Sequence, residues 1–418
     1  MTRNVSTRIA GGLQGILPRL ADASPPKGPS HDTIDLSSAE NILIRDQLQD
    51  MCKAAIQNHL NSDTLSELPS FGGDVGARTA LASFLNNYFR PASTVSADHI
   101  VLTAGAGLCI EALIHSICDE GDSVIIPGPH WFGFQPYITL RPKVNIITAT
   151  PPTYARHGDD LVSTLRATYN DAETPERIKA MILCNPHNPF SQCYTEQGLR
   201  ECMKFCQEFG LHLISDELYA LATIKTTENQ RSEFISTLSL MSNASDAETL
   251  IDPSLVHVVW SASKLLGLSG LRIGCVVSQS NPEIRAAVSL LTYLNVSSLS
   301  AITLTAILSS PDLSQLLYVN SQRITASYAC FTKLFRGLNV EFLPAQEGLF
   351  IFAKLGKSIM SIEEEIAFFE NLRQRGVLVS AGRFYSGLST EFGWARVLIA
   401  VPLATAEEAV KRLSLCIS

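Results

Sequence analysis

Short apolar runs recur along the middle of the chain, and polar or amphipathic sequence separates them. Seven runs are short, rich in β-branched residues and almost continuously apolar: 99–104, 123–128, 144–149, 180–185, 211–216, 256–261 and 272–278. Such runs are typical of strands buried on both faces of a sheet. Helix-like segments lie between most of them, for example 195–210, which ends in glycine. The alternation predicts an open α/β sheet.

The last third of the chain has a different pattern. The amphipathic segments 363–376 and 405–415 flank two apolar runs, GLFIFAKL and ARVLIAV. This arrangement predicts a smaller α+β domain at the C-terminus. We expect an N-terminal arm and part of the small domain in 1–45, a large domain in 46–295, and the small domain in 296–418.

Size and composition restrict the class of protein. The chain has 418 residues, of which 46% are hydrophobic and 17% charged, enough for a large interior in two or three packed units. The net charge of −8 comes without blocks of like charge, which argues against nucleic acid as a partner. Ten cysteines are scattered without metal-like spacing. They predict reduced thiols in a cytoplasmic protein and no metal site.

Two segments resemble targeting or membrane signals. Arg3, Arg8 and Arg19 precede the first acidic residue, as in a mitochondrial presequence, although an arm that lies on a partner subunit is the favoured interpretation. Residues 286–311 carry no formal charge and could span a bilayer. Because this segment contains Asn295 and many serines and threonines, we expect a long buried helix and no membrane contact.

The carboxyl ends of the strands should hold any ligand, as in other open α/β sheets. The first such end is a small-residue turn, Gly105, Ala106 and Gly107, that leads into a helix and could bind a phosphate through its amides. A second end carries Asn188 between prolines. A plain turn would explain either segment without a ligand.

Two further strand ends carry charged residues. Asp216 ends an apolar run, with Tyr219 three residues on, and a carboxylate there needs a cationic partner unless it caps a helix. Lys264 and Arg272 follow another run, near the hydroxyls of Ser261 and Ser263. A lysine near apolar surface can form a Schiff base, and an arginine can bind phosphate through two hydrogen bonds.

Together these groups match one ligand that has an aldehyde, a pyridine nitrogen, a phenolic hydroxyl and a phosphate. That ligand is pyridoxal 5′-phosphate (PLP), whose electron-sink chemistry needs a protonated ring nitrogen beside a carboxylate. Two solvated surface cations would be the simpler explanation of Lys264 and Arg272.

From about residue 34 onward the sequence resembles the fold-type I PLP enzymes of the class I/II aminotransferase superfamily. The motif S-x-S-K-x-x-G-x-x-G-x-R-x-G is met in full by residues 261–274. The resemblance implies a large, mixed, mostly parallel sheet domain with a smaller α+β C-terminal domain, and a homodimer with shared active sites. It implies that Lys264 binds the cofactor and shuttles protons, that Asp216 pairs with the pyridinium, and that Tyr219 and Asn188 bind the ring hydroxyl. Ser261 and Arg272 match phosphate ligands, and Trp131 matches the aromatic residue that stacks on the ring.

Within that superfamily the chain looks most like the 1-aminocyclopropane-1-carboxylate (ACC) synthase branch and its fungal relatives. Arg396 matches the arginine that binds the substrate α-carboxylate, and Ala39 and Glu40 lie in a triplet that resembles the ACC synthase pattern. Glu40 either faces the substrate or makes an ordinary N-terminal contact. Phe71 stands where a tyrosine usually reaches the neighbouring subunit's phosphate site.

Two other departures concern the cofactor site. Gly107 replaces a serine or threonine in the phosphate turn, and Phe190 replaces a glycine after the Asn-Pro pair. The cofactor should therefore bind with fewer side-chain donors.

The resemblance implies that an amino acid loses its Cα proton. We expect ACC synthase-like lyase chemistry, or elimination or substitution at Cβ or Cγ, including carbon–sulfur cleavage, on a specialised substrate. The alternative is an aminotransferase with a 2-oxo acid acceptor. A third reading, a binding protein with the same fold and no catalysis, is disfavoured because Lys264, Asp216 and Arg396 are all present.

Overall fold

The structure is a computed structural model. It describes residues 5–6, 9–10, 12–13, 32–66, 70–225, 233–241, 251–385 and 391–417, with the side chain of Arg156 excepted. Most of the predicted N-terminal arm, including Arg3, Arg8 and Arg19, lies outside these residues.

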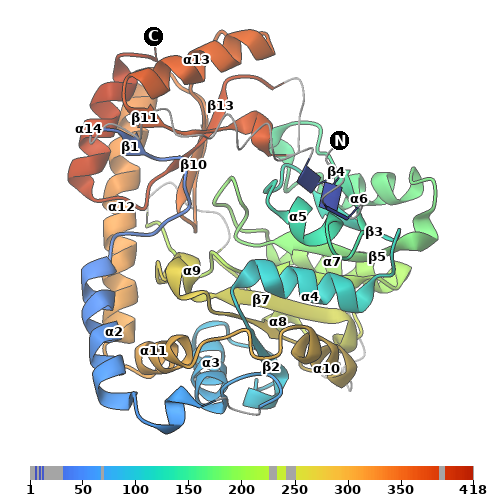
Figure 1. The fold of residues 1–418 in the computed structure, drawn as a ribbon. Coiled ribbons are helices and arrows are strands. Elements are labelled where there is room, and N and C mark those ends of the chain that lie inside the picture. The colour runs from blue at the N-terminus through green and yellow to red at the C-terminus, as the bar shows by residue number, and fades with distance from the viewer. Residues whose placement is uncertain are drawn as a thin grey trace.

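A seven-stranded mixed sheet forms the centre of the larger part of the molecule (Figure 1). In spatial order its strands are β2 (Ile100–Thr103), β8 (Gly274–Val277), β7 (Val256–Ser261), β6 (His212–Asp216), β5 (Ile178–Cys184), β3 (Ser123–Pro127) and β4 (Asn145–Ala149). Among the described strands of this sheet, β8 runs in one direction and the other six run in the opposite one. All seven predicted strands are therefore confirmed, as is the mostly parallel character of the sheet.

Helices cover both faces of this sheet, which explains why its strands are apolar on both sides. One face packs on α4 (Ala106–Ile117), α5 (Phe134–Thr139) and α10 (Pro282–Leu291). The other packs on α3 (Val75–Tyr88), α7 (Glu196–Phe209), α11 (Ser298–Leu308) and neighbouring helices. Alternate residues of each strand enter opposite layers; in β7, for example, Val259 faces α4 whereas Val258 faces the other layer. Figure 1 shows α4 crossing in front of the strands. This part also contains α6 (Leu161–Asn170), α8 (Thr237–Leu240) and α9 (Ala262–Leu265).

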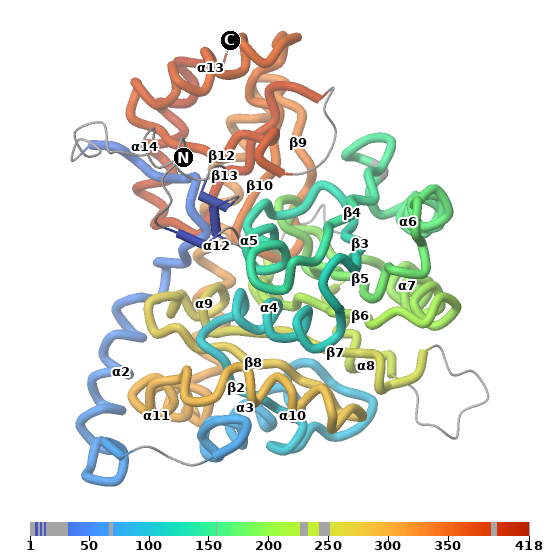
Figure 2. Tube along the Cα trace, turned by 45° about the vertical axis from the view of Figure 1, so that its right-hand side comes forward, coloured from blue at the N-terminus to red at the C-terminus, as the bar shows by residue number. Residues whose placement is uncertain are grey.

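A smaller unit lies above the large sheet in both views of the backbone (Figures 1 and 2). Its antiparallel sheet has the order β12 (Ser380–Ala381), β13 (Trp394–Leu398), β10 (Phe350–Lys354) and β9 (Phe342–Leu343). It also contains α13 (Ile362–Gln374), α14 (Leu403–Ser414) and the upper part of the long α12 (Leu313–Gly337). This confirms the predicted α+β character of the C-terminal part.

The N-terminal segment connects the two units. The short strand β1 (Ile34–Asp35) pairs in parallel with β11 (Val377–Leu378), and the chain then runs down to α2 (Arg45–His59), beside α12 (Figure 1). The exact domain limits, 45/46 and 295/296, stay a prediction.

The expected long helix in 286–311 is wrong. The segment forms the end of α10 and then α11, separated by residues 292–297. The second helix starts afresh because the Ser297 side chain caps it, accepting a hydrogen bond from the Leu299 amide, and Leu294 has a positive φ of 59° that no helix continues through. No helix in the described part of the chain is long and apolar enough to cross a bilayer.

Candidate active site

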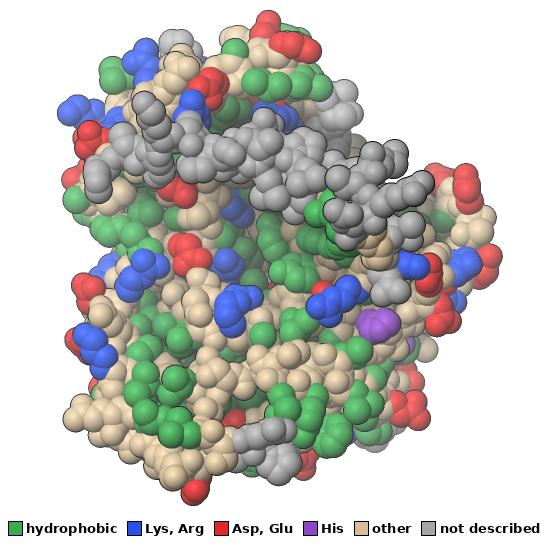
Figure 3. Space-filling view, viewed as in Figure 1, with side chains coloured by type: hydrophobic (Ala, Val, Ile, Leu, Met, Phe, Trp, Pro, Cys, Tyr) green, Lys and Arg blue, Asp and Glu red, His purple; other side chains and the backbone are tan. Residues whose placement is uncertain are grey.

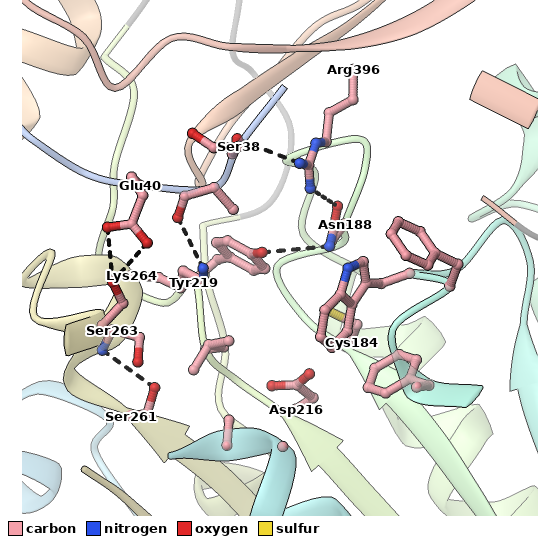
Figure 4. Close-up of a pocket in the computed structure, with 18 of the residues that line it drawn as sticks. Ser38, Glu40, Cys184, Asn188, Asp216, Tyr219, Ser261, Ser263, Lys264 and Arg396 are labelled. Atoms are coloured by element: carbon pink, nitrogen blue, oxygen red, sulfur yellow. Dashed lines mark hydrogen bonds between the residues drawn. The ribbon is translucent and has the colours of Figure 1, made fainter. Parts of the chain in front are cut away.

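A cavity of about 670 Å³ opens between the two units at the carboxyl ends of β5, β6 and β7. The N-terminus of α4 closes one side, and β12, β13 and the 37–40 segment close the other. Among the described residues, 25 line its wall, including these predicted site residues: Ala39, Glu40, Ala106, Gly107, Trp131, Asn188, Asp216, Tyr219, Ser261, Ser263, Lys264, Arg272 and Arg396. Figure 4 shows ten of the wall residues with labels.

Lys264 lies on the single turn of α9 that directly follows β7. Its ammonium group donates a hydrogen bond to the Ala39 carbonyl oxygen, 2.9 Å away (Figure 4). Burial lowers the pKa of Lys264 to about 8; Arg396 and Arg272 lower it too, whereas Glu40 and Asp216 act against the shift. A lysine with this pKa loses its proton near neutral pH, as a nucleophile or general base must.

Asp216 ends β6 on the floor of the cavity and is only 5% exposed. Burial raises its pKa to about 7, and one carboxylate oxygen, Oδ1, has no hydrogen-bond partner among the described residues. An orphaned acceptor in the interior costs free energy unless a ligand supplies the donor. The arrangement therefore suits a ligand with an N–H or a positive charge at this point.

A cradle for an anion lies beside Lys264. Ala106 and Gly107 begin α4, so their amides precede its first intrahelical hydrogen bonds. Arg272 lies against the same turn, since a Cβ at Gly105 would be 2.6 Å from its Nη2, and the guanidinium donates to the Ala104 carbonyl. The backbone of Arg272 has a φ of 50°, in the left-handed region that residues other than glycine rarely adopt. Strained backbone conformations of this kind are often found at functional sites.

Two serines complete this cradle. Ser261 caps α9 by accepting a hydrogen bond from the Ser263 amide. A Cβ at Gly274 would come within 2.9 Å of the Ser261 Cβ and 3.1 Å of the Ala106 amide nitrogen, so glycine is what lets the two sides meet.

Asn188, Tyr219 and Arg396 form a chain of hydrogen bonds along another wall. The Asn188 amide donates to the Tyr219 hydroxyl at 3.4 Å, and Arg396 Nη1 donates to the Asn188 oxygen at 3.1 Å (Figure 4). A second Arg396 donor binds the Ser37 carbonyl at 2.8 Å. The guanidinium stacks 3.9 Å above the centre of the Phe350 ring. Arg396 is thus fixed in direction, as binding of a planar carboxylate requires.

Glu40 and Trp131 also line the cavity. The Glu40 carboxylate accepts hydrogen bonds from the Ser269 hydroxyl at 2.6 and 2.8 Å and lies 3.7 Å from Arg45. It faces the cavity and contacts other residues as well, so both interpretations of Glu40 remain open. Trp131 packs edge-on against Phe134.

Phe71 and Phe190, the two departures from the family pattern that involve phenylalanine, do not line the cavity. Phe71 is 63% exposed, stacks on Tyr293 with 5.5 Å between ring centres, and does not line its own chain's cavity. Phe190 is completely buried in an aromatic cluster with Tyr154 and Phe352. Its replacement of glycine therefore fills the interior and does not reshape the cavity.

Sequence reasoning missed several wall residues: Ser37, Ser38, Ile110, Phe132, Phe134, Tyr137, Cys184, Leu218, Ser269, Val379, Ser380 and Phe384. Leu218 is the one that the sequence could have indicated, because it lies between the two predicted site residues Asp216 and Tyr219. The others are serines, a cysteine, a tyrosine and apolar residues without a motif of their own. Among the described residues, no group of three or more metal-ligating side chains exists.

Comparisons with known proteins find similar chains along almost the whole sequence. The chain is 35% identical to the probable aminotransferase aclI of Aspergillus oryzae and 34% identical to the probable aminotransferase sirI of Leptosphaeria maculans, each over 98% of this chain and 97% of the relative. The fold matches that of the aspartate aminotransferase of Thermus thermophilus with maleate, with a TM-score of 0.78 over 99% of this chain and 100% of that one, at 17% identity.

The comparisons also refine the predicted branch. The mouse 1-aminocyclopropane-1-carboxylate synthase-like protein 1 is 27% identical over 89% of this chain and 73% of its own length. The chain is therefore more similar to these fungal aminotransferases than to this ACC synthase-like protein. The predicted likeness to fungal relatives is confirmed, whereas the ACC synthase-like proteins are more distant. The family model described as aminotransferase class I and II matches residues 31–413, almost the whole described chain. The chain belongs to the class I and II aminotransferases and is an enzyme of that family.

Proposed function

We propose that this enzyme binds PLP and uses it to transfer the amino group of an amino acid to a 2-oxo acid. The single observation that carries the proposal is the placing of Lys264, Asp216 and the anion cradle around one cavity. The residues fit the cofactor. The unpartnered Asp216 oxygen suits a protonated ring nitrogen, Asn188 and Tyr219 suit its hydroxyl, and the α4 amides with Arg272 suit its phosphate.

When bound, PLP would supply the electron sink that stabilises the substrate carbanion. The residues of the chain do the rest. Arg396 binds the α-carboxylate through its fixed guanidinium, which orients the Cα–H bond. Lys264, with its lowered pKa, would then take the α-proton onto its Nζ and hold it there for return to the substrate. Asp216 would hold the protonated ring nitrogen of the cofactor, because an adjacent positive charge would oppose the effect of burial on the pKa of its carboxyl group.

The remaining wall favours an amino acid with one carboxylate and an apolar side chain. Lys264, Arg272 and Arg396 are the cationic residues among the described part of the wall, and the proposal already uses all three. Phe132 and Phe384, from the two units, lie with ring centres 6.5 Å apart at the partly exposed mouth. Aromatic surfaces of this kind bind apolar groups.

Elimination or substitution at Cβ or Cγ, including carbon–sulfur cleavage, is the second candidate. Glu40 is the observation that favours it, because its carboxylate lines the same cavity as Lys264 and could act on a leaving group. The described part of the wall has no further cation to bind the second carboxylate of a dicarboxylic 2-oxo acid, and this also favours a reaction that needs no such acceptor. The names of the fungal relatives nevertheless support transamination over elimination.

A homodimer would complete the proposed site. Exposed apolar side chains lie before and at the start of α3 and around the end of α10: Leu65, Phe71, Val75, Leu290 and Leu294. Figure 3 shows apolar surface in the lower part of the molecule, where these two helices lie. Exposed apolar surface of this extent is typical of an interface. Sedimentation of the purified enzyme tests this, and a monomer at micromolar concentration would contradict it. A cytoplasmic location stays a prediction.

One assay separates the two chemical candidates. Purified enzyme with PLP is mixed with apolar amino acids and S-alkyl cysteines, with and without 2-oxo acids. A new amino acid formed only when the 2-oxo acid is present indicates transamination. Release of ammonia and a thiol without an acceptor indicates elimination. If the enzyme binds no PLP, or its lysine-bound cofactor absorbance persists in Lys264→Ala, the proposal fails.

A further inference from the structure

Gly107 has a neighbour that explains why it is glycine. A Cβ at position 107 would lie 2.3 Å from Cζ of Tyr137 and 2.6 Å from its hydroxyl oxygen. Contacts this short do not occur between real atoms, and the nearer one is to the rigid ring. Serine or threonine therefore cannot occupy position 107 while Tyr137 keeps its place.

The Tyr137 hydroxyl itself is a polar group facing the cavity. Tyr137 lies on α5, packed against α4, and its side chain lines the same wall as Ala106 and Gly107. Its hydroxyl makes no hydrogen bond with any of the described residues. A partly buried phenol usually finds a partner, so this donor is free for a ligand.

We infer that the Tyr137 hydroxyl is a phosphate-positioning group of this enzyme, and that it takes the place of a side-chain hydroxyl at position 107. It lies within 2.6 Å of where the Cβ of such a residue would be, at the first turn of α4. A phenol donating to a phosphate oxygen makes a charge-assisted hydrogen bond. The inference rests on the proposed function, since it needs PLP in the cavity.

Binding of PLP to the cofactor-free enzyme, followed by protein fluorescence and cofactor absorbance, tests it directly. Tyr137→Phe keeps the ring and removes only the hydroxyl. We expect this variant to bind PLP about tenfold or more weakly, the usual effect of losing a hydrogen bond to a charged group. Its affinity for pyridoxal, which lacks the phosphate, should not change.

A pair of double variants tests whether the two positions are equivalent. Tyr137→Ala should weaken PLP binding and open space at position 107. Adding Gly107→Ser to it should restore much of the lost affinity, whereas adding Gly107→Ala, the matched control without a hydroxyl, should not. In the presence of Tyr137, Gly107→Ser should weaken PLP binding because the serine has no room.

The outcomes are distinct. If Tyr137→Phe binds PLP as tightly as the wild type, or loses PLP and pyridoxal affinity equally, the phosphate role is overturned. If serine and alanine at position 107 act alike in the Tyr137→Ala background, the equivalence is overturned. Failure of the wild-type enzyme to bind PLP would instead refute the proposed function.

Discussion

Asp216 should destabilise the cofactor-free protein at neutral and higher pH. It is 5% exposed, one of its oxygens has no partner among the described residues, and its pKa is raised by burial to about 7 from 3.8. Because the folded pKa lies above the unfolded one, the folded chain holds a proton that the unfolded chain has lost. Stability is therefore greatest below the unfolded pKa and falls as the pH rises through this window.

The size of the effect follows from the two pKa values. At about pH 8 the carboxyl group lowers the free energy of unfolding by about 4 kcal/mol, and at about pH 5.5 by about 2 kcal/mol. Asp216→Asn removes the ionisation and nearly preserves the shape. Any constant cost of burying the amide is the same at both values of pH. The free energy of unfolding of the variant, relative to that of the wild type, should thus increase by about 2 kcal/mol when the pH is raised from about 5.5 to about 8.

Urea unfolding of the two cofactor-free proteins, at equal concentration and at both pH values, measures this difference. The buried Glu217 and Glu347 also have pKa values raised to about 7, but they are present in both proteins and their effects largely cancel. The variant should also bind PLP more weakly, since it lacks the charge that pairs with the ring nitrogen. Parallel stability–pH profiles for the two proteins would refute the reasoning.

Four further predictions concern single residues. Lys264→Ala should abolish turnover and the absorbance of the lysine-bound cofactor, and full activity in the variant would contradict its role. Arg396→Lys should raise KM for the amino acid about tenfold or more while PLP affinity stays unchanged, because lysine lacks the planar fork; steady-state kinetics and a PLP titration measure the two effects. Gly105→Ala should lower PLP affinity about tenfold, because the new Cβ would clash with the Arg272 guanidinium and the backbone φ of 92° is unfavourable for alanine. The control Gly158→Ala, where no atom lies within 4 Å of the new Cβ, should leave the PLP titration unchanged. Phe190→Ala should cost about 3–5 kcal/mol in a urea titration without changing KM, and a change in KM alone would argue that Phe190 acts on the substrate.

The strands and the charged site residues could be predicted because each carries a local signal. The seven apolar runs are buried on both faces, and their polar ends converge on one cavity. The wall formed by Ser37, Tyr137 and Phe384 could not be predicted. These residues come from three distant segments, and only the packing of the two units brings them together.

Local departures from a familiar pattern were harder to interpret. Gly107 alone indicates a lost hydroxyl, and only its contact with Tyr137 shows what fills the space. The prediction of one continuous helix across 286–311 was wrong for a related reason. It relied on the apolar composition of the segment, but the Ser297 side chain caps a new helix there, and composition alone does not indicate where a helix begins.

The segment from Ser37 to Ala39 holds two charged residues of the site through its main chain alone. Carbonyl oxygens of Ser37 and Ala39 accept hydrogen bonds from Arg396 and Lys264. Every amino acid has a carbonyl, so substitutions at 37–39 can alter the cavity wall without removing these contacts. Evolution thus has three adjacent positions at which the range of accepted substrates can change while the reactive groups keep their places.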